Sequence, residues 1–241
     1  MTEVIETIMQ NGLRKYKVKN SKMRLLTSES EGNKGAIFAY RSKESMIEGI
    51  GLVLTSEESI LENEDKFSHF TPNIFRYGTY ADPDRLFTKG HREDNLRQIN
   101  TFFLDIDTLD PKFNYGEMIL ACHEFGYPPT MVLKSPRGYQ VFFVLKKAAY
   151  VTKKSNYKVI ECAKRISNNL RAHFKKQGFP IDFNANHFGI TRMPSHDNLL
   201  FFDKEARYSF QEWIDWSINY DFENRSKKSR LSWLGIRVIP K

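Results

Sequence analysis

The alternation of apolar and polar positions predicts several strands in the central part of the chain. Apolar runs at 35–40 and 101–107 have the length that is typical of strands. The runs at 130–135 and 139–145 flank the tetrapeptide Ser-Pro-Arg-Gly, which predicts a hairpin with a type I turn closed by a left-handed glycine. Another apolar run, at 198–203, predicts one more strand.

Apolar positions spaced by three and four residues predict two amphipathic helices. One spans 114–125 and ends at Gly126, and a longer one spans about 153–177 and ends at Gly178. Capping-box spacings open two more helices, at Thr55 and Glu58 and at Ser209 and Glu212. We therefore expect an α/β (α+β) protein whose antiparallel-rich sheet has helices 114–125 and 153–177 packed on one face.

Composition and charge narrow the class of protein. The 241 residues are 40% hydrophobic, and they include neither an apolar run that could span a bilayer nor a signal-peptide pattern. We therefore expect a cytoplasmic protein without a membrane partner. The net charge of +8 is compatible with a polyanionic partner. Cys122 and Cys162 lack the spacing of a zinc site, so we expect reduced core cysteines.

The distribution of polar residues predicts one main domain with two flanking segments. Residues 1–34 are polar and basic, and we expect them to precede a domain at 35–220. Residues 221–241 are basic and have no clear periodicity. They are interpreted as a linker or as the start of a further region.

Two aspartates alternate with apolar residues in the sequence FFLDIDT, at 102–108. On a strand, Asp105 and Asp107 project from the same face at a spacing of about 7 Å, where their charges repel. A divalent metal would offset that repulsion, although the pair also fits a strand end whose carboxylates point to water. Asp182 follows a second apolar run. Three such carboxylates suit two-metal phosphoryl or nucleotidyl transfer, in which the ions lie about 4 Å apart.

The predicted hairpin turn carries small and basic residues that are suited to a triphosphate. Ser135, Arg137 and Gln140 lie at or beside this turn. Taken alone, the turn also fits a purely structural hairpin.

In their order along the chain, these features resemble the archaeo-eukaryotic primase superfamily. Its first motif, two acidic residues alternating with apolar ones, is matched by Asp105 and Asp107. Its second, a serine with a glycine-containing turn and a histidine entering a strand, is matched at Ser135 and Gly138. Its third, an apolar residue followed by aspartate, is matched at Ile181 and Asp182.

The chain resembles still more closely the primase-like N-terminal domain of replication initiators from theta-replicating plasmids of Gram-positive bacteria. The segments TPNIFRYGTY, NLRQINTFFLDIDT, SPRGYQVFFVL, NHFGITRMP and YSFQEWIDWS carry this resemblance, which extends from about 35 to 220. It implies a primase-like fold, a two-metal site for Mg²⁺ or Mn²⁺ at the three aspartates, and nucleoside triphosphates as substrates. It also implies origin DNA, a single-stranded DNA template and host replication proteins as partners.

One position departs from the superfamily pattern. Gln140 stands where primases place the histidine that contacts the nucleotide phosphates, and glutamine offers only a neutral hydrogen bond. His187, Arg192 and Arg137 are the candidates to replace that contact, with Ser135 and Gly138 completing the expected nucleotide-binding set.

Two functions remain open from the sequence. The first is a nucleotidyltransferase whose aspartates hold two metal ions, and the second is a catalytically silent initiator that uses the primase fold to bind origin DNA. A rolling-circle relaxase is disfavoured because no two histidines are separated by a single apolar residue. A Toprim-type primase is disfavoured because no suitable glutamate precedes the Asp-x-Asp strand.

Overall fold

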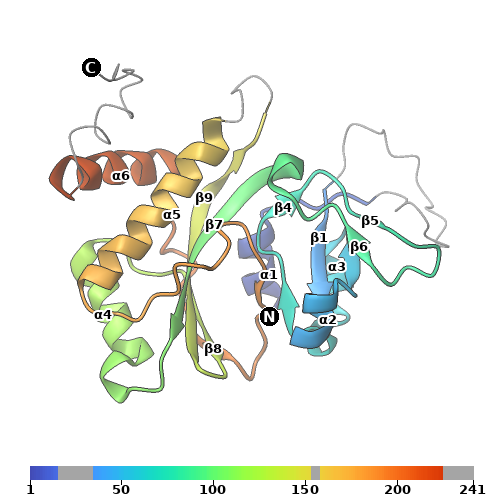
Figure 1. Ribbon diagram of the computed structural model, residues 1–241, viewed down its shortest axis with the longest axis horizontal. Helices are drawn as coiled ribbons and strands as arrows, with labels where there is room; N and C mark the ends of the chain where they lie inside the picture. The colour runs from blue at the N-terminus through green and yellow to red at the C-terminus, as the bar shows by residue number, and fades with distance from the viewer. Residues whose placement is uncertain (16–34, 153–157, 225–241) are drawn as a thin grey trace.

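Two antiparallel sheets organise the residues that the computed structural model describes, which are 1–15, 35–152 and 158–224 (Figure 1). The larger has the strand order β11-β8-β9-β7-β4, the smaller the order β10-β3-β1-β2, and β5 and β6 pair as a separate ribbon. The large sheet comprises β4 (Ile74–Phe75), β7 (Leu96–Asp107), β8 (Met131–Ser135), β9 (Gly138–Tyr150) and β11 (Leu199–Phe202). The small sheet comprises β1 (Ile37–Tyr40), β2 (Leu52–Leu54), β3 (His69–Phe70) and β10 (Thr191–Arg192), and the ribbon pairs β5 (Thr79–Tyr80) with β6 (Thr88–Lys89).

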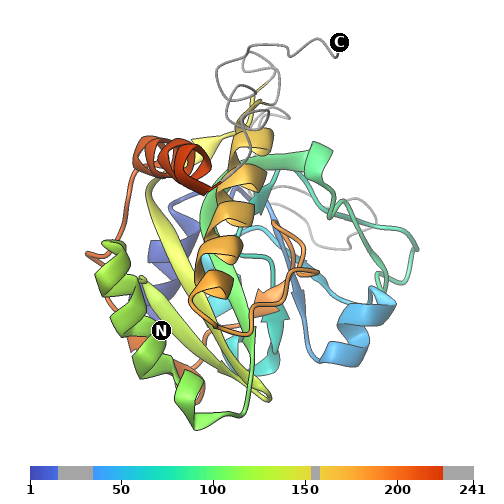
Figure 2. The same cartoon turned by 60° about the vertical axis from the view of Figure 1, so that its left-hand side comes forward.

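The main helices are α4 (Tyr115–Phe125), α5 (Lys158–Lys176) and α6 (Phe210–Asn224), and they cover one face of the large sheet (Figure 2). Along β7, Phe102, Leu104 and Ile106 share the core with these helices. Because side chains alternate across a strand, Asp105 and Asp107 project from the other face. The predicted α/β class, with an antiparallel sheet and helices on one face, is confirmed.

The opposite face of the large sheet packs against α1 (Thr2–Met9) and the small sheet. Ile5, Ile8 and Met9 of α1 are buried in this second core. Asn100 of β7 donates its side-chain N–H to Ile8 O at 2.7 Å and to Met9 O at 3.1 Å, which satisfies carbonyls at the end of α1. Residues 1–15 are therefore part of the domain core, which differs from the expectation of a separate basic segment at 1–34.

Two short helices lie beside the small sheet, α2 (Lys43–Glu48) and α3 (Glu57–Leu61). The predicted box at Thr55 and Glu58 is wrong by one residue, because Ser56 caps α3 by accepting from Ser59 N at 3.3 Å. The box at Ser209 and Glu212 is confirmed by reciprocal hydrogen bonds of 2.7 and 3.2 Å. Helix α4 is capped by Asn114 and ends at Gly126, as predicted.

The hairpin between β8 and β9 is confirmed, but its glycine differs from the expected left-handed one. Gly138 has φ +153°, and a Cβ there would lie 1.9 Å from Ile106 O on β7. Glycine is therefore needed for the close approach of β9 to β7. Of the longer predicted helix, 153–157 lies outside the described residues, as do 16–34 and 225–241 of the flanking segments. Within the described part of the chain, every helix is too short or too polar to cross a bilayer.

Candidate active site

The three predicted aspartates meet at the end of β7. Asp105 lies opposite Gln140 on β9, and Asp107 lies opposite Gly138. The segment that carries Asp182 runs along the other edge of β7, where Ile181 bridges Ile106 and Asp182 N donates to Asp105 O at 3.0 Å. Residues that are 75 or more positions apart in the chain are thus held together by backbone pairing.

Each of these carboxylates accepts a hydrogen bond. Arg137 Nη2 donates to Asp107 Oδ2 at 2.6 Å, and Gln140 Nε2 donates to Asp105 Oδ2 at 3.2 Å. Asp182 Oδ1 accepts from Asn184 N at 2.8 Å. Burial raises the pKa of Asp105, the hydrogen bond from Gln140 opposes that rise, and the charges of Asp107 and Asp182 add to it. The carboxyl of Asp105 therefore senses the charges of the other two aspartates.

The donor chemistry at this point fits a hard divalent cation. Carboxylate oxygens are the ligands that Mg²⁺ and Mn²⁺ prefer. Among the residues described, no three Asp, Glu, His or Cys side chains are already arranged around a common point as a metal site. Asp107 would exchange its hydrogen bond from Arg137 for the ion, whereas Asp105 would keep the bond from Gln140 on Oδ2 and offer its other oxygen.

Gln140 connects the two sheets. Its side chain is only 6% exposed, and both ends of its amide are used within the protein. Nε2 donates to Asp105, while Oε1 accepts from Arg192 N on β10 at 2.8 Å. Gln140, which the sequence predicts to contact phosphate, therefore links the Asp105 carboxylate to the small sheet by two hydrogen bonds.

The turn residues lie beside the carboxylates as expected. Ser135 pairs with Gly138 across the hairpin, and Ser135 is half-buried. Arg137 is exposed at the tip, from which its guanidinium reaches Asp107. The turn therefore brings one cation and one hydroxyl to the end of β7.

His187 and Arg192 lie in the segment that follows Asp182. His187 Nδ1 lies 3.0 Å from Ser167 Oγ on α5. Burial, with the nearby charges of Arg171 and Lys164, lowers the pKa of His187 to about 4, so its imidazole is neutral at pH 7. His187 therefore offers a neutral hydrogen bond, and Arg192 is the cation of the pair.

His69 is a neighbour of the site that the sequence did not single out. It pairs with Arg192 across β3 and β10, and its Nδ1 lies 2.7 Å from Ser68 Oγ. Burial, followed by the charges of Arg192 and Lys43, lowers the pKa of His69 to about 4. No motif marks this histidine, because only the pairing of two distant strands brings it to Arg192.

Arg171 of α5 is a second unexpected neighbour. Its side chain is 2% exposed, and Nη1 donates to Phe183 O at 3.4 Å. Within the described residues, Nη2 has no hydrogen-bond partner. Burial lowers the pKa of Arg171, and the carboxylates of Asp182 and Asp105 oppose that shift. The only sequence signal is its helical spacing from Ser167, which places both residues on one face of α5.

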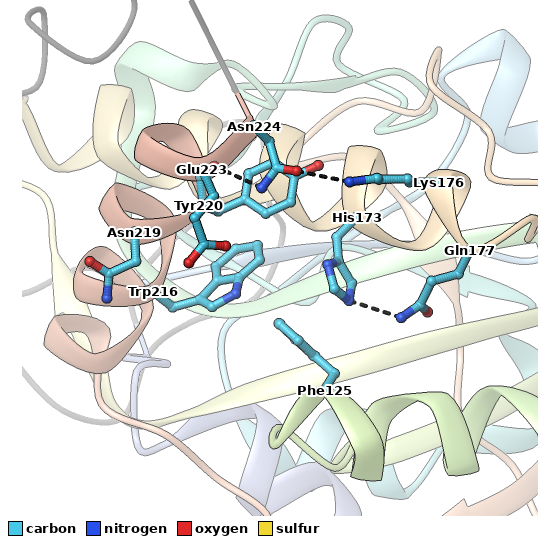
Figure 3. A pocket seen from close by; sticks show the side chains of 9 residues that line it. All are labelled: Phe125, His173, Lys176, Gln177, Trp216, Asn219, Tyr220, Glu223 and Asn224. Atoms are coloured by element: carbon cyan, nitrogen blue, oxygen red, sulfur yellow. Dashed lines mark hydrogen bonds between the residues drawn. The ribbon is translucent and has the colours of Figure 1, made fainter.

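A separate pocket of about 470 Å³ lies on the helical side of the large sheet (Figure 3). Trp216 and Tyr220 of α6 face Phe125 and His173 across it. Trp213 is fully buried, whereas Trp216 is only half-buried. The pocket includes none of the predicted site residues and lies across the sheet from the carboxylates.

Comparisons with known proteins give three close relatives. The chain is 52% identical over 233 residues to Protein RepR of Streptococcus agalactiae, covering 96% of this chain and 47% of the relative. It is 54% identical over 216 residues to Protein RepS of Streptococcus pyogenes, covering 89% and 43%. It is 40% identical over 234 residues to a replication initiation protein of Bacillus anthracis, covering 91% and 46%. The chain thus spans somewhat less than half the length of these relatives.

Two other comparisons add less. No family model matches the chain. Among solved structures, the primase-polymerase domain of cyanophage S-2L is similar with a TM-score of 0.46 and 13% identity, over 77% of this chain and 91% of that one. This similarity is too low for any role to be transferred. From the sequence relatives we conclude that the chain is a homologue of the replication initiation proteins of Gram-positive bacteria, over the part of their length that it covers.

Proposed function

We propose that this chain performs metal-dependent nucleotidyl transfer on a DNA template, as the primase-polymerase-like part of a plasmid replication initiator. The observation that carries the proposal is the meeting of Asp105, Asp107 and Asp182 at the end of β7. A fold gains nothing in stability from three interacting carboxylates unless a cation joins them. The match to replication initiation proteins supports a role in DNA synthesis.

Asp105, Asp107 and Asp182 would hold Mg²⁺ or Mn²⁺, which when bound lowers the pKa of a 3′-hydroxyl and neutralises charge on the triphosphate. Asp107 is exposed and Asp105 is half-buried at the end of β7, so ligands can reach their carboxylates there. Gln140 keeps Asp105 oriented through its hydrogen bond.

The triphosphate would lie between the hairpin turn and β10. Arg137 and Arg192 supply positive charge from the two sides, and the Ser135 hydroxyl adds a hydrogen-bond donor. Arg137 would exchange its exposed ion pair with Asp107 for a phosphate, because exposed pairs contribute little. His187, being neutral, would hydrogen-bond to a substrate oxygen without adding charge.

The proposed partners follow from this reaction. They are nucleoside triphosphates, a single-stranded template, origin DNA and host replication proteins. The net charge of +8 favours polyanionic partners.

A catalytically silent origin-binding initiator is the second candidate, and one observation favours it. The amide of Gln140 is fully used within the protein, so the position of the superfamily histidine makes no cationic contact with a phosphate. Such a protein would keep the fold and the basic surface while making no primers.

The deciding experiment is primer synthesis on a single-stranded template with labelled nucleotides and Mg²⁺ or Mn²⁺. The wild type is compared with the double variant Asp105→Ala, Asp107→Ala, and with Asp65→Ala, which removes an exposed aspartate from the Glu64–Lys66 turn. Products from the wild type and from Asp65→Ala, lost in the double variant, are the expected result. If the wild type is folded and binds DNA but makes no product, the result would contradict the enzyme and support the catalytically silent initiator.

A further inference from the structure

The ribbon formed by β5 and β6 encloses a second pocket, of about 390 Å³. Figure 1 shows this ribbon at the edge of the molecule opposite α6. Its two walls are 77–81 and 89–92. We call this pocket the ribbon groove, and its lining includes Tyr77, Tyr80, Lys89 and Arg92.

A buried side chain links the two walls of the ribbon groove. Asn95 is 4% exposed, and its Nδ2 donates to Tyr77 O at 2.6 Å and to Gly90 O at 2.7 Å. Gly90 has φ +119°, and a Cβ there would lie 2.9 Å from Tyr77 O. The two walls are therefore fixed against each other by a buried residue, and the glycine allows their close approach.

The exposed groups of the groove suit single-stranded nucleic acid. Tyr77 is 43% exposed, so its ring is accessible to a ligand in the groove. Lys89 and Arg92 are exposed beside it. Arg92 pairs with Asp94 at 3.1 Å, but both side chains are 68% exposed, so a phosphate can compete for the guanidinium at little cost. Aromatic faces flanked by cations are the general means of holding unpaired bases and their phosphates.

The groove is also joined to the segment that carries the site residues. His91 lies in the wall at 89–92, and its Nε2 lies 3.4 Å from Phe188 O. Phe188 follows His187 in the segment that begins at Asp182. Lys164 of α5 and Glu93 form a further tie at 2.9 Å. The groove is thus joined, through His91 and Phe188, to the segment that begins at Asp182.

We propose that the ribbon groove binds single-stranded DNA, stacking a base on Tyr77 and pairing phosphates with Lys89 and Arg92, on the template path to the carboxylates. The assignment to template rests on the proposed function, whereas the binding itself does not. Duplex DNA is excluded as the occupant because its bases are already stacked on one another and offer no free face to Tyr77.

The test is fluorescence anisotropy with a labelled single-stranded oligonucleotide over a range of salt concentrations. Tyr77→Ala is compared with Tyr115→Ala, another tyrosine exposed to a similar extent. The double variant Lys89→Ala, Arg92→Ala is compared with Lys146→Ala, Lys147→Ala, which removes two exposed lysines from β9. Thermal unfolding of each variant shows that it is folded.

We expect Tyr77→Ala to weaken binding about tenfold. The double variant at Lys89 and Arg92 should lower the slope of log affinity against log salt by about 1.4, the value for two phosphate contacts on a single strand. The control variants should bind like the wild type. Groove variants that bind single-stranded DNA as tightly as the wild type would overturn the inference, and so would a groove-dependent preference for duplex DNA or RNA.

Primer synthesis separates this inference from the proposed function. A wild type that binds single-stranded DNA through the groove but makes no primers leaves the groove assignment intact and removes only the template role. In the opposite case, the Asp105 and Asp107 variant loses primer synthesis, while the groove variants keep both primer synthesis and DNA affinity. That result would contradict DNA binding by the groove and support the proposed enzyme.

Discussion

Gln140 and Asp105 face each other across β9 and β7, and the glutamine amide donates to the aspartate carboxylate at 3.2 Å. The same amide accepts from the backbone N–H of Arg192 at 2.8 Å. One buried side chain therefore sets the orientation of a site carboxylate and the position of the small sheet together.

Replacing Gln140 with leucine should lower the free energy of unfolding by about 1–3 kcal/mol. The substitution leaves the partly buried Arg192 N–H without its acceptor and removes a donor from a carboxylate. Urea unfolding measures the change, and Gln211→Leu, an exposed position on α6, should stay within about 0.5 kcal/mol of the wild type. Equal effects of the two substitutions would show that the hydrogen bonds of Gln140 contribute nothing to the free energy of unfolding.

Replacing Arg171 with methionine should tighten binding of Mn²⁺ to the carboxylates by a few-fold. The guanidinium is a permanent positive charge that acts on Asp105 and Asp182, so it competes with a bound cation. The readout is the rise in unfolding temperature on adding Mn²⁺, which should be larger in the methionine variant than in wild type. Arg171→Lys keeps the charge and should behave like wild type; if all three proteins respond alike, the guanidinium does not act on the carboxylates.

Replacing Arg137 with alanine should weaken nucleotide binding without changing the stability of the fold. Its ion pair with Asp107 is exposed, so the unfolding midpoint should not change measurably. The affinity for a labelled nucleoside triphosphate should fall, by about tenfold if one charge-assisted contact is lost. Lys66→Ala, an exposed cation beside the small sheet, is the matched control and should leave nucleotide affinity unchanged.

The stability of the protein should fall as the pH drops from about 6.5 toward 4, in part because of His69 and His187. The pKa of each is lowered to about 4 in the folded protein, below the value near 6.5 for an unfolded chain. The unfolded state then binds protons that the folded state does not, so the contribution of these groups is complete above pH 6.5 and is lost below it. Unfolding in urea at pH 7 and pH 5 measures the difference.

His187→Gln should reduce this pH dependence, since glutamine keeps a neutral hydrogen bond and has no proton to gain. His196→Gln, the same substitution at an exposed histidine, is the matched control. An unchanged pH dependence in His187→Gln would mean that His187 takes up its proton as readily in the folded protein as in the unfolded chain.

Local pattern predicted the elements whose partners are near in sequence. The alternation around Asp105 and Asp107 defined their shared face, and the turn after Ser135 defined the hairpin, because both depend on neighbouring residues alone. The third aspartate was singled out by the apolar run before it and by its resemblance to a motif, and backbone pairing does bring it to β7.

The contacts that the sequence did not predict are all long-range. The burial of Arg171, the approach of His69 to Arg192 and the double use of the Gln140 amide each depend on how separate strands and helices meet. The periodicity of the sequence carries no information about such long-range contacts. A buried arginine on α5 therefore cannot be distinguished, from the sequence, from an exposed polar residue beside an apolar stripe. The cap at Ser56 was missed for a smaller reason, since two adjacent hydroxyl residues compete for one position.

The bonds from Asn100 to the end of α1 affect how the protein can be shortened or tagged. A version that begins after Met9 would leave Phe103 and Phe142 partly uncovered and the Asn100 amide without its acceptors. Such a version would expose an apolar surface on the side of the sheet that carries the carboxylates, and it would tend to aggregate. Loss of activity after trimming these first residues would therefore report on solubility rather than on chemistry.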